Sequence, residues 1–396
     1  MSNIPKLRFP EFKGEWEKSE LGKFTQEITR VNPNSDAPIM MISAANGFIL
    51  QSNKYSKEMT GQSLKKYIEL HAGEFAYNHG ASKLKKYGAC FCLDLDKARI
   101  PFVYHCFKLK EGNTKFFSYL LNRTQLDSEL ARYISSSARM DGLLNISYTD
   151  YMKINISVPT LAEQQKIADF LSNVDSIITA ETKILNSLQK KKKALMQKLF
   201  TQQLRFKSDD GTDFPAWEEK KLGEFCKTYS GGTPKSGTAD YYGGEIPFIR
   251  SGEISSNKTE LFLTEKGMEN SSAKMVSKGD ILYALYGANS GLCSISKIDG
   301  AINQAILCIK TKENKRFLCN YLQYQREYFY STYLQGGQGN LSGKLVESFI
   351  IPLPCLVEQQ KIADCLSSMD LLIQNQQKVV TTWQQRKKAL LQQMFI

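Results

Sequence analysis

Apolar residues recur every three or four positions along two long stretches of the chain. Neither stretch contains glycine or an internal proline, and each covers about 38 residues, or about 57 Å as an α-helix. Four to five heptads of this spacing predict a coiled-coil seam. The seam positions are Ile167, Leu171, Val174, Ile178, Leu185, Leu188, Leu195 and Leu199 in the first stretch, and Ile362, Leu366, Met369, Ile373, Val380, Trp383, Leu390 and Met394 in the second.

Polar residues interrupt both seams at matching places, Glu181 and Lys192 in the first and Gln376 and Lys387 in the second. Polar seam positions fix register and orientation at some cost in stability. One hypothesis is therefore that the two helices pair with each other, antiparallel, around an internal pseudo-two-fold axis. The alternative is that each helix packs on its own globular unit. Thr160 and Glu163 have the spacing of a capping box at the start of the first helix.

The two helices belong to a longer repeat. The block LAEQQKIAD at 161–169 returns as LVEQQKIAD at 356–364, an offset of 195. Upstream, LRF at 7–9 returns at 204–206, and Trp16 returns as Trp217. This order predicts four segments, which are a globular domain at 1–157, a helix at 158–200, a second globular domain at 201–352 and a second helix at 353–396. The intervening stretches, about 25–135 and 226–330, show no evident sequence similarity.

Both globular segments alternate short β-like runs with glycine, asparagine and serine turns. The expected strands are 89–93 and 102–107 in the first segment and 280–286 and 301–309 in the second. Helical patterns follow at 116–134 and 316–334. The fold class predicted is α+β, with two mixed globular domains separated by the two long helices.

Composition excludes several classes of protein. The 396 residues are 42% hydrophobic and 23% charged, which is ordinary globular usage. No apolar run approaches the roughly 20 residues that span a bilayer, so no membrane role is expected. Nine scattered cysteines fit a reducing cytoplasm better than a disulfide framework.

The net charge of +12 makes nucleic acid the first partner to consider. The charge is uneven, because residues 1–157 carry +6 and residues 201–352 only +1. Any basic face on the second globular segment must therefore come from the distribution of its charges.

Catalytic motifs are missing. The three histidines, His71, His79 and His105, are not spaced as metal ligands with one another or with a cysteine. Neither a phosphate-binding glycine loop nor a dinucleotide fingerprint occurs. We therefore expect a binding protein, with an enzyme of divergent site as the alternative.

The candidate DNA-binding residues are basic, amide and hydroxyl side chains in turn-rich segments. Lysine and arginine neutralise phosphates, and amides recognise the edges of nucleobases. The alternative for the lysine-rich loop at 83–86, and for the lysine run 190–193 on the first helix, is a solvated surface. The candidates are Tyr77, Asn78, His79, Lys83, Lys85, Lys86, Ser136 and Arg139 in the first globular segment, and Thr233, Lys235, Arg250, Ser251, Gln338 and Asn340 in the second.

This layout resembles the specificity subunit of type I restriction–modification systems. The resemblance rests on the paired EQQKIAD helix starts at 163–169 and 358–364, on the openings around Trp16 and Trp217, and on GGTPK at 231–235. YGGEIPFIR at 242–250 and GDIL at 279–282 also look like this family's target-recognition domains. The first globular segment lacks the GGTP run.

The resemblance implies that each globular domain reads one half of a bipartite, asymmetric site in double-stranded DNA. It implies that the helices set the spacing and dock two DNA adenine methyltransferase (modification) subunits through the seam residues. No cofactor is expected in this chain, since S-adenosylmethionine would be bound by the methyltransferase, and ATP and Mg²⁺ by restriction (translocase) subunits that can join. A non-catalytic cytoplasmic protein is expected. The alternative is a coiled-coil scaffold without a DNA role.

Overall fold

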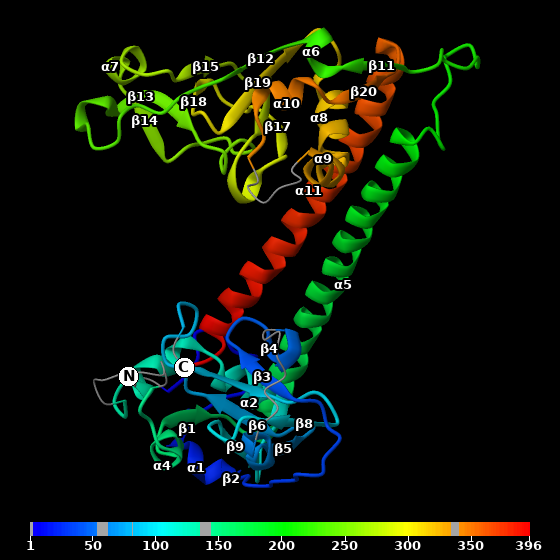
Figure 1. Ribbon diagram of the computed structural model, residues 1–396. Helices are drawn as coiled ribbons and strands as arrows, with labels where there is room; N and C mark the ends of the chain where they lie inside the picture. The colour runs from blue at the N-terminus through cyan, green and yellow to red at the C-terminus, as the bar shows by residue number, and fades with distance from the viewer. Residues whose placement is uncertain (1–2, 54–61, 81, 135–143, 334–339) are drawn as a thin grey trace. The chain divides into compact units, whose positions relative to one another are not determined.

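The computed structural model describes residues 3–53, 62–80, 82–134, 144–333 and 340–396 (Figure 1). The chain forms two compact units. Unit 1 comprises Met1–Thr182 and Lys378–Ile396, and unit 2 comprises Lys183–Gln377. Each unit therefore contains one globular part, the first half of its own long helix and the second half of the other.

Unit 1 is built on a four-stranded antiparallel sheet in the order β2-β9-β6-β7, with three two-stranded sheets, β1-β10, β3-β4 and β5-β8. Its elements are β1 (Glu17–Glu20), α1 (Leu21–Phe24), β2 (Thr25–Glu27), β3 (Met40–Ser43), β4 (Gly47–Leu50), β5 (Ile68–His71), β6 (Phe75–Asn78), β7 (Ala89–Cys92), β8 (Lys97–Ile100), β9 (His105–Leu109), α2 (Thr114–Leu121), α3 (Asp127–Leu130), α4 (Tyr148–Met152) and β10 (Asn155–Val158).

Unit 2 repeats that sheet as β12-β19-β16-β17 and the short pair as β11-β20, and adds a four-stranded sheet, β14-β13-β18-β15. Its elements are β11 (Glu218–Lys221), α6 (Leu222–Phe225), β12 (Cys226–Ser230), β13 (Tyr242–Ile249), β14 (Leu261–Leu263), α7 (Glu265–Glu269), β15 (Lys274–Val276), β16 (Ile281–Ala284), β17 (Cys293–Ile295), β18 (Gly300–Ile302), β19 (Ile306–Thr311), α8 (Lys315–Tyr324), α9 (Arg326–Tyr333), α10 (Gly343–Glu347) and β20 (Ile350–Leu353).

The two globular parts thus share the topology of one four-stranded sheet and one short strand pair, although their interiors have no evident sequence similarity. In both, a short strand and a one-turn helix lead into the edge strand of the four-stranded sheet, and α2 or α8 follows the strand paired with it. A strand tolerates many side chains on a pleated surface, so the same sheet can form from different residues.

The long helices are α5 (Leu161–Phe200), of 40 residues, and α11 (Leu356–Gln393), of 38 residues. This confirms the helices that the periodicity predicts, and every predicted seam position is buried or half-buried. In unit 1 the start of α5 packs beside the end of α11, and in unit 2 the start of α11 packs beside the end of α5. The pairing within each unit is therefore antiparallel. Each helix also packs on its own globular part, so the two arrangements considered from the sequence are combined.

The end of each long helix completes the core of the other globular part. Met394 and Phe395 lie in the core of unit 1 with Trp16, and Leu199 and Phe200 lie in the core of unit 2. The Phe395 ring stacks at a tilt on Phe116, with centroids 5.3 Å apart. In unit 2 the equivalent residues, Phe200 and Phe317, meet edge to face, with centroids 5.8 Å apart.

Several predicted elements have different bounds. The helix expected over 316–334 divides after Tyr324 into α8 and α9, and the strands expected at 89–93 and 280–286 are shorter, as β7 and β16. The strand expected at 102–107 begins at His105, because Pro101 opens a turn in which the Tyr104 N–H bonds the Pro101 carbonyl. The run 301–309 divides into β18 and β19, which belong to different sheets. The helix expected over 116–134 is interrupted after Leu121, at the end of α2.

Candidate DNA interface

The repeated Glu-Gln-Gln at the start of each long helix joins the helix to its globular part. The Arg8 guanidinium donates two hydrogen bonds to the Glu163 carboxylate, at 2.7 and 2.8 Å, and the Trp16 indole donates a third at 3.2 Å. Glu163 is 1% exposed, so its charge depends on these donors. The residues that repeat this cluster in unit 2 are Arg205, Trp217 and Glu358. Long-range donors thus account for the repeated glutamate, and the capping box of Thr160 and Glu163 stays a prediction.

The two glutamines that follow fix the loop after the central strand of the sheet. The Gln164 side-chain oxygen accepts the Asn113 backbone N–H at 2.9 Å, and its nitrogen donates to the Pro159 carbonyl. The Asn113 side chain donates to Gln165 at 2.7 Å. The equivalent bonds in unit 2 join Asn314 to Gln359 and Gln360 and Gln359 to Pro354. The long helix therefore attaches at the edge of the sheet where β9 or β19 ends.

In the sheets β2-β9-β6-β7 and β12-β19-β16-β17, the opposite edge carries the connecting loops. In unit 1, Asn78 pairs with Ala89 and Tyr77 with His105, so β6 ends where β7 and β9 begin. In unit 2, Ala284 pairs with Ile306 in the same relation. We call these loops the loop edge. It comprises 28–39, 79–80, 82–88 and 101–104 in unit 1, and 231–241, 285–292 and 303–305 in unit 2.

Two candidates of unit 1, Tyr77 and His79, lie buried at the base of the loop edge. Tyr77 is 1% exposed, stacks on Tyr151 with centroids 3.9 Å apart and donates to the Tyr87 carbonyl. His79 is also buried, between the carbonyls of Leu144 and Val103 at 2.7 and 3.0 Å. These two side chains support the loops from inside. Such burial argues against direct contact with DNA.

Asn78 and the three lysines complete the candidates of unit 1 that the structure describes. Asn78 is half-buried and donates to the Ile42 carbonyl. Lys85 donates to the Asn122 carbonyl, and burial lowers the pKa of its ammonium. Lys83 and Lys86 are exposed on the loop edge, which leaves them able to meet a phosphate.

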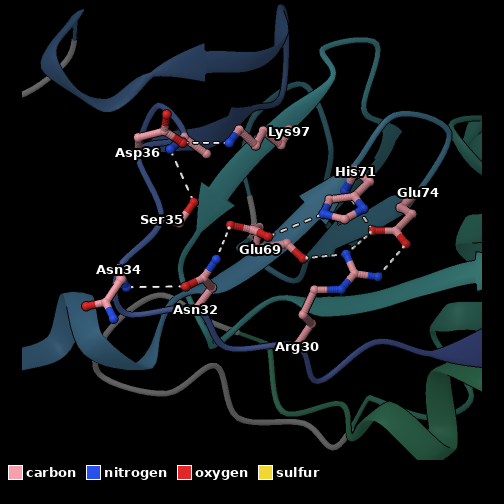
Figure 2. Close-up of polar contacts among 10 residues, drawn as sticks. Arg30, Asn32, Asn34, Ser35, Asp36, Glu69, His71, Glu74 and Lys97 are labelled. Atoms are coloured by element: carbon pink, nitrogen blue, oxygen red, sulfur yellow. Dashed lines mark hydrogen bonds and ion pairs between the residues drawn. The ribbon is translucent and has the colours of Figure 1, made fainter.

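A polar network holds the 28–39 loop against β5 and β8 (Figure 2). Arg30 donates to both carboxylate oxygens of Glu74, at 3.1 and 3.0 Å, and the Asn32 amide donates to Glu69 at 3.1 Å. Hydrogen bonds from Ser35, His71 and Asn32 hold the pKa of Glu69 below its ordinary value. Arg30 is thus paired within the fold, and the network fixes the shape of the loop.

In unit 2 the candidate Thr233 lies on the loop edge beside a residue that the sequence did not single out. The Thr233 hydroxyl donates to the Gln304 side-chain oxygen at 2.6 Å, and both residues are exposed. Lys235 is exposed in the same loop. The loop edge of unit 2 therefore presents a hydroxyl, an amide and an ammonium group together.

Arg250 and Ser251 leave β13 beside the loop edge, since Ile249 pairs with Ile302. Arg250 donates to the carboxylates of Glu253 and Glu260, at 3.1 and 2.5 Å, and these bonds raise the pKa of its guanidinium. Its charge is thus balanced within the fold.

Of the four remaining DNA-binding candidates, the structure describes only Asn340. Asn340 is exposed, just before Leu341, whose N–H bonds the Leu285 carbonyl at the loop edge. Ser136, Arg139 and Gln338 lie outside the described residues.

Two of the four polar seam positions, Lys192 and Lys387, form ion pairs within their units. Lys192 lies 2.6 Å from Asp370 in unit 2, and Lys387 lies 2.5 Å from Asp175 in unit 1. The other lysines of the 190–193 run are exposed, as the solvated alternative expects. Over the described ranges, no group of three acidic, histidine or cysteine residues could hold a metal ion. Among the helices that the structure describes, none has the length and apolarity to cross a membrane.

Sequence reasoning missed Arg8, Asn113 and Gln304. Arg8 could have been found from the sequence, because it lies in the repeated LRF block. An arginine and a glutamate that are both repeated suggest an ion pair. Asn113 and its counterpart Asn314 lie in stretches without evident similarity. Gln304 lies inside a run that reads as one strand, so only the division into β18 and β19 exposes it.

Comparison with known proteins follows the same two-part division. The family model described as the type I restriction modification DNA specificity domain matches residues 102–190 and 216–382. The chain is similar to the putative type I restriction enzyme MjaX specificity subunit of Methanocaldococcus jannaschii, with 26% identity over 415 residues, which cover 98% of this chain and 95% of that protein. It is also similar to the EcoR124I/EcoR124II specificity subunit of Escherichia coli, with 28% identity over 247 residues, which cover 57% of this chain and 58% of that protein.

Two solved structures share the fold. The type I restriction–modification system S subunit from M. genitalium is 15% identical, with a TM-score of 0.59 over 99% of both chains. A chain from a study of complex assembly and conformational transition of the type I R-M system is 18% identical. Its TM-score is 0.58 over 96% of this chain and 97% of that one.

Proposed function

Because this chain belongs to the family of type I restriction modification DNA specificity domains, we propose that its two globular parts read the two halves of a bipartite, asymmetric site in double-stranded DNA. The loop edges are the reading surfaces. The long helices set the gap between the half-sites and dock two adenine methyltransferase subunits. The chain itself is non-catalytic and acts in the cytoplasm, and restriction subunits can join the complex.

One observation carries the proposal. The equivalent sheets β2-β9-β6-β7 and β12-β19-β16-β17 attach to a long helix at one edge and present their connecting loops at the other. A rigid sheet that holds variable loops away from its attachment is the usual arrangement for recognition, because loops can change while the scaffold stays. The loop edges differ in chemistry, with Lys83 and Lys86 on unit 1 and Thr233 and Gln304 on unit 2. Different surfaces on equal scaffolds would read different half-sites.

The docking role of the helices is supported by apolar residues that remain exposed along them. Leu161 and Leu356, at the first position of each helix, are 62% and 57% exposed, and Leu371 is 58% exposed. Leu161 and Leu356 occupy equivalent positions, so the two helices would offer equivalent contacts to two like subunits. The methyltransferase subunits would supply S-adenosylmethionine binding and the extrusion of the target adenine.

A base-resolution methylation map tests the proposal. A methylation-free host would express the chain with the modification subunit encoded beside it, and each protein alone as controls. The expected result is a split, asymmetric adenine-methylated motif with a fixed gap, present only when both proteins are made. Methylation without this chain would favour the scaffold alternative, and methylation by this chain alone would show that it is an enzyme.

A further inference from the structure

We propose that Gln304 of unit 2 is a base-reading residue that recognises an adenine–thymine pair, and that Thr233 positions it. The inference rests on the proposed function, because it names a reader on the loop edge of unit 2. It goes further by assigning a particular base pair to a particular side chain.

Gln304 stands on a loop whose backbone is tightly fixed. The Asn303 side-chain oxygen accepts the Ala305 N–H at 3.1 Å, and the Asn303 carbonyl accepts the Ile306 N–H at 3.2 Å. These two bonds form a tight turn between β18 and β19. The turn leaves the Gln304 side chain exposed at the loop edge.

The loop that carries Thr233 packs closely against the end of β18, directly before this turn. A Cβ atom added at Gly231 would lie 1.8 Å from the Ile302 carbonyl oxygen, and one added at Gly232 would lie 2.2 Å from the Ser272 hydroxyl. Only glycine permits so close an approach. The Tyr242 hydroxyl donates to the Pro234 carbonyl at 2.9 Å and fixes the far side of the same loop. Thr233 is therefore held in place beside Gln304.

The hydrogen bond between the two side chains orients the amide. The Thr233 hydroxyl donates to the Gln304 side-chain oxygen at 2.6 Å, which leaves one lone pair of that oxygen available. The amide nitrogen has no hydrogen-bond partner among the described residues and keeps both of its hydrogens. The exposed end of Gln304 therefore offers one donor and one acceptor side by side.

Adenine presents the matching pair in the major groove. Its N6 amino group donates and its N7 accepts, and glutamine or asparagine binds both at once. Guanine presents two acceptors there, so the same amide would leave one group unsatisfied. The exposed Lys235 lies in the Thr233 loop, where it can neutralise an adjacent phosphate. Positions 101–104 of unit 1 precede β9 as 303–305 precede β19, but expose Phe102 and Val103 instead, so this reader is specific to unit 2.

The test compares methylation by variants of the full chain, expressed with the modification subunit. Wild-type protein should require an A·T pair at one position of one half-site. Gln304→Ala should reduce that discrimination roughly tenfold to a hundredfold, as expected for loss of a two-bond base contact, and should leave the other half-site unchanged. Gln304→Glu should shift the preference at that position toward C·G, because a carboxylate accepts from the cytosine amino group.

Thr233 provides a test of positioning. Thr233→Val should relax the same base pair as Gln304→Ala, whereas Thr233→Ser should retain the preference because the hydroxyl remains. Gln203→Ala is the matched control, since it removes an exposed amide from the segment that follows α5, away from the loop edge.

The outcomes separate the inference from the proposed function. A wild-type motif that Gln304→Ala and Gln304→Glu leave unchanged overturns the inference alone. Loss of all methylation in every Gln304 variant also overturns it, because a reader of one base pair relaxes discrimination and does not abolish assembly. The absence of a methylated motif with wild-type protein overturns the proposed function itself.

Discussion

Phe395 contacts Trp16 edge to face, with ring centroids 6.1 Å apart in the core of unit 1. The chain thus closes the core of its first globular part with a residue that closely follows its last helix, α11. Phe200 fills the equivalent place in unit 2.

We expect Phe395→Ala to destabilise unit 1 by about 3–5 kcal/mol, the usual cost of removing a buried phenylalanine. Hydrogen exchange measured segment by segment should show faster exchange in unit 1. Phe200→Ala should produce the same effect in unit 2. Leu372→Ala is the control on α11, because Leu372 is 52% exposed. Equal exchange in both units after either core substitution would contradict this use of the helix ends.

Glu163→Ala should destabilise unit 1 by about 3–5 kcal/mol, because it leaves the Arg8 charge and the Trp16 indole without their buried acceptor. Glu358→Ala should do the same in unit 2. The control is Lys166→Ala, one helix turn after Glu163 on α5. It removes only an exposed ion pair with Glu11 and should cost less than about 1 kcal/mol. Chemical denaturation followed by hydrogen exchange would locate each loss. A small effect of Glu163→Ala would mean that the repeated glutamate does not hold the helix to the globular part.

Two glycines of unit 2 should respond differently to alanine. Gly231→Ala should cost about 1–3 kcal/mol by overpacking and should impair recognition of the half-site read by unit 2. Gly252 has room for a Cβ atom, whose nearest neighbour would be Asn289 at 3.6 Å, so Gly252→Ala should be tolerated. Thermal unfolding and the methylation map would measure the two effects. Equal tolerance of both substitutions would argue against a tightly fitted loop.

Glu253 should make the stability of unit 2 depend on pH. Burial favours a raised pKa, but hydrogen bonds from Arg250, from the Glu260 backbone and from Thr259 lower the pKa from 4.5 to about 2. A carboxylate with a lowered pKa stabilises the fold above its unfolded value and loses that contribution as pH falls through its folded value. Glu253→Gln should therefore be less stable than wild type at pH 7, and the difference should shrink between pH 4.5 and about 2.

Urea unfolding of both proteins at several pH values measures that difference. The control is Glu245→Gln, which changes an exposed carboxylate on β13. A difference that stays constant down to pH 2 would show that the charge of Glu253 is not what stabilises the turn.

Lengthening a long helix should test whether the helices set the gap between half-sites. One added heptad extends a helix by about 10.5 Å, or about three base pairs of duplex. We expect the methylated motif to change its gap, or methylation to be lost, with both half-sites unchanged. An altered half-site with an unchanged gap would count against a spacing role.

The long helices could be predicted from the sequence because helical periodicity is local. Seam residues such as Leu171 and Leu366 repeat every three to four positions whatever their partners are, and they are fully buried as expected. The strands were predicted less well, because β18 and β19 lie in one run that the sequence pattern predicts as a single strand, and they separate only by joining different sheets. Base-reading candidates were the least predictable. Tyr77 and Lys83 belong to one polar, aromatic stretch, and only burial distinguishes them.

The sequence by itself determined the duplication, the two helices with their seams and the absence of recognised catalytic motifs, since these depend on residue identity and spacing along the chain. Tertiary structure alone decided that the repeated glutamate binds an arginine 155 positions away. It also decided that unlike stretches form the same sheet, and that Gln304 lies beside Thr233 although 71 positions separate them. The physical reason is that burial and hydrogen-bond partners come from long-range packing, which leaves no periodic signal along the chain.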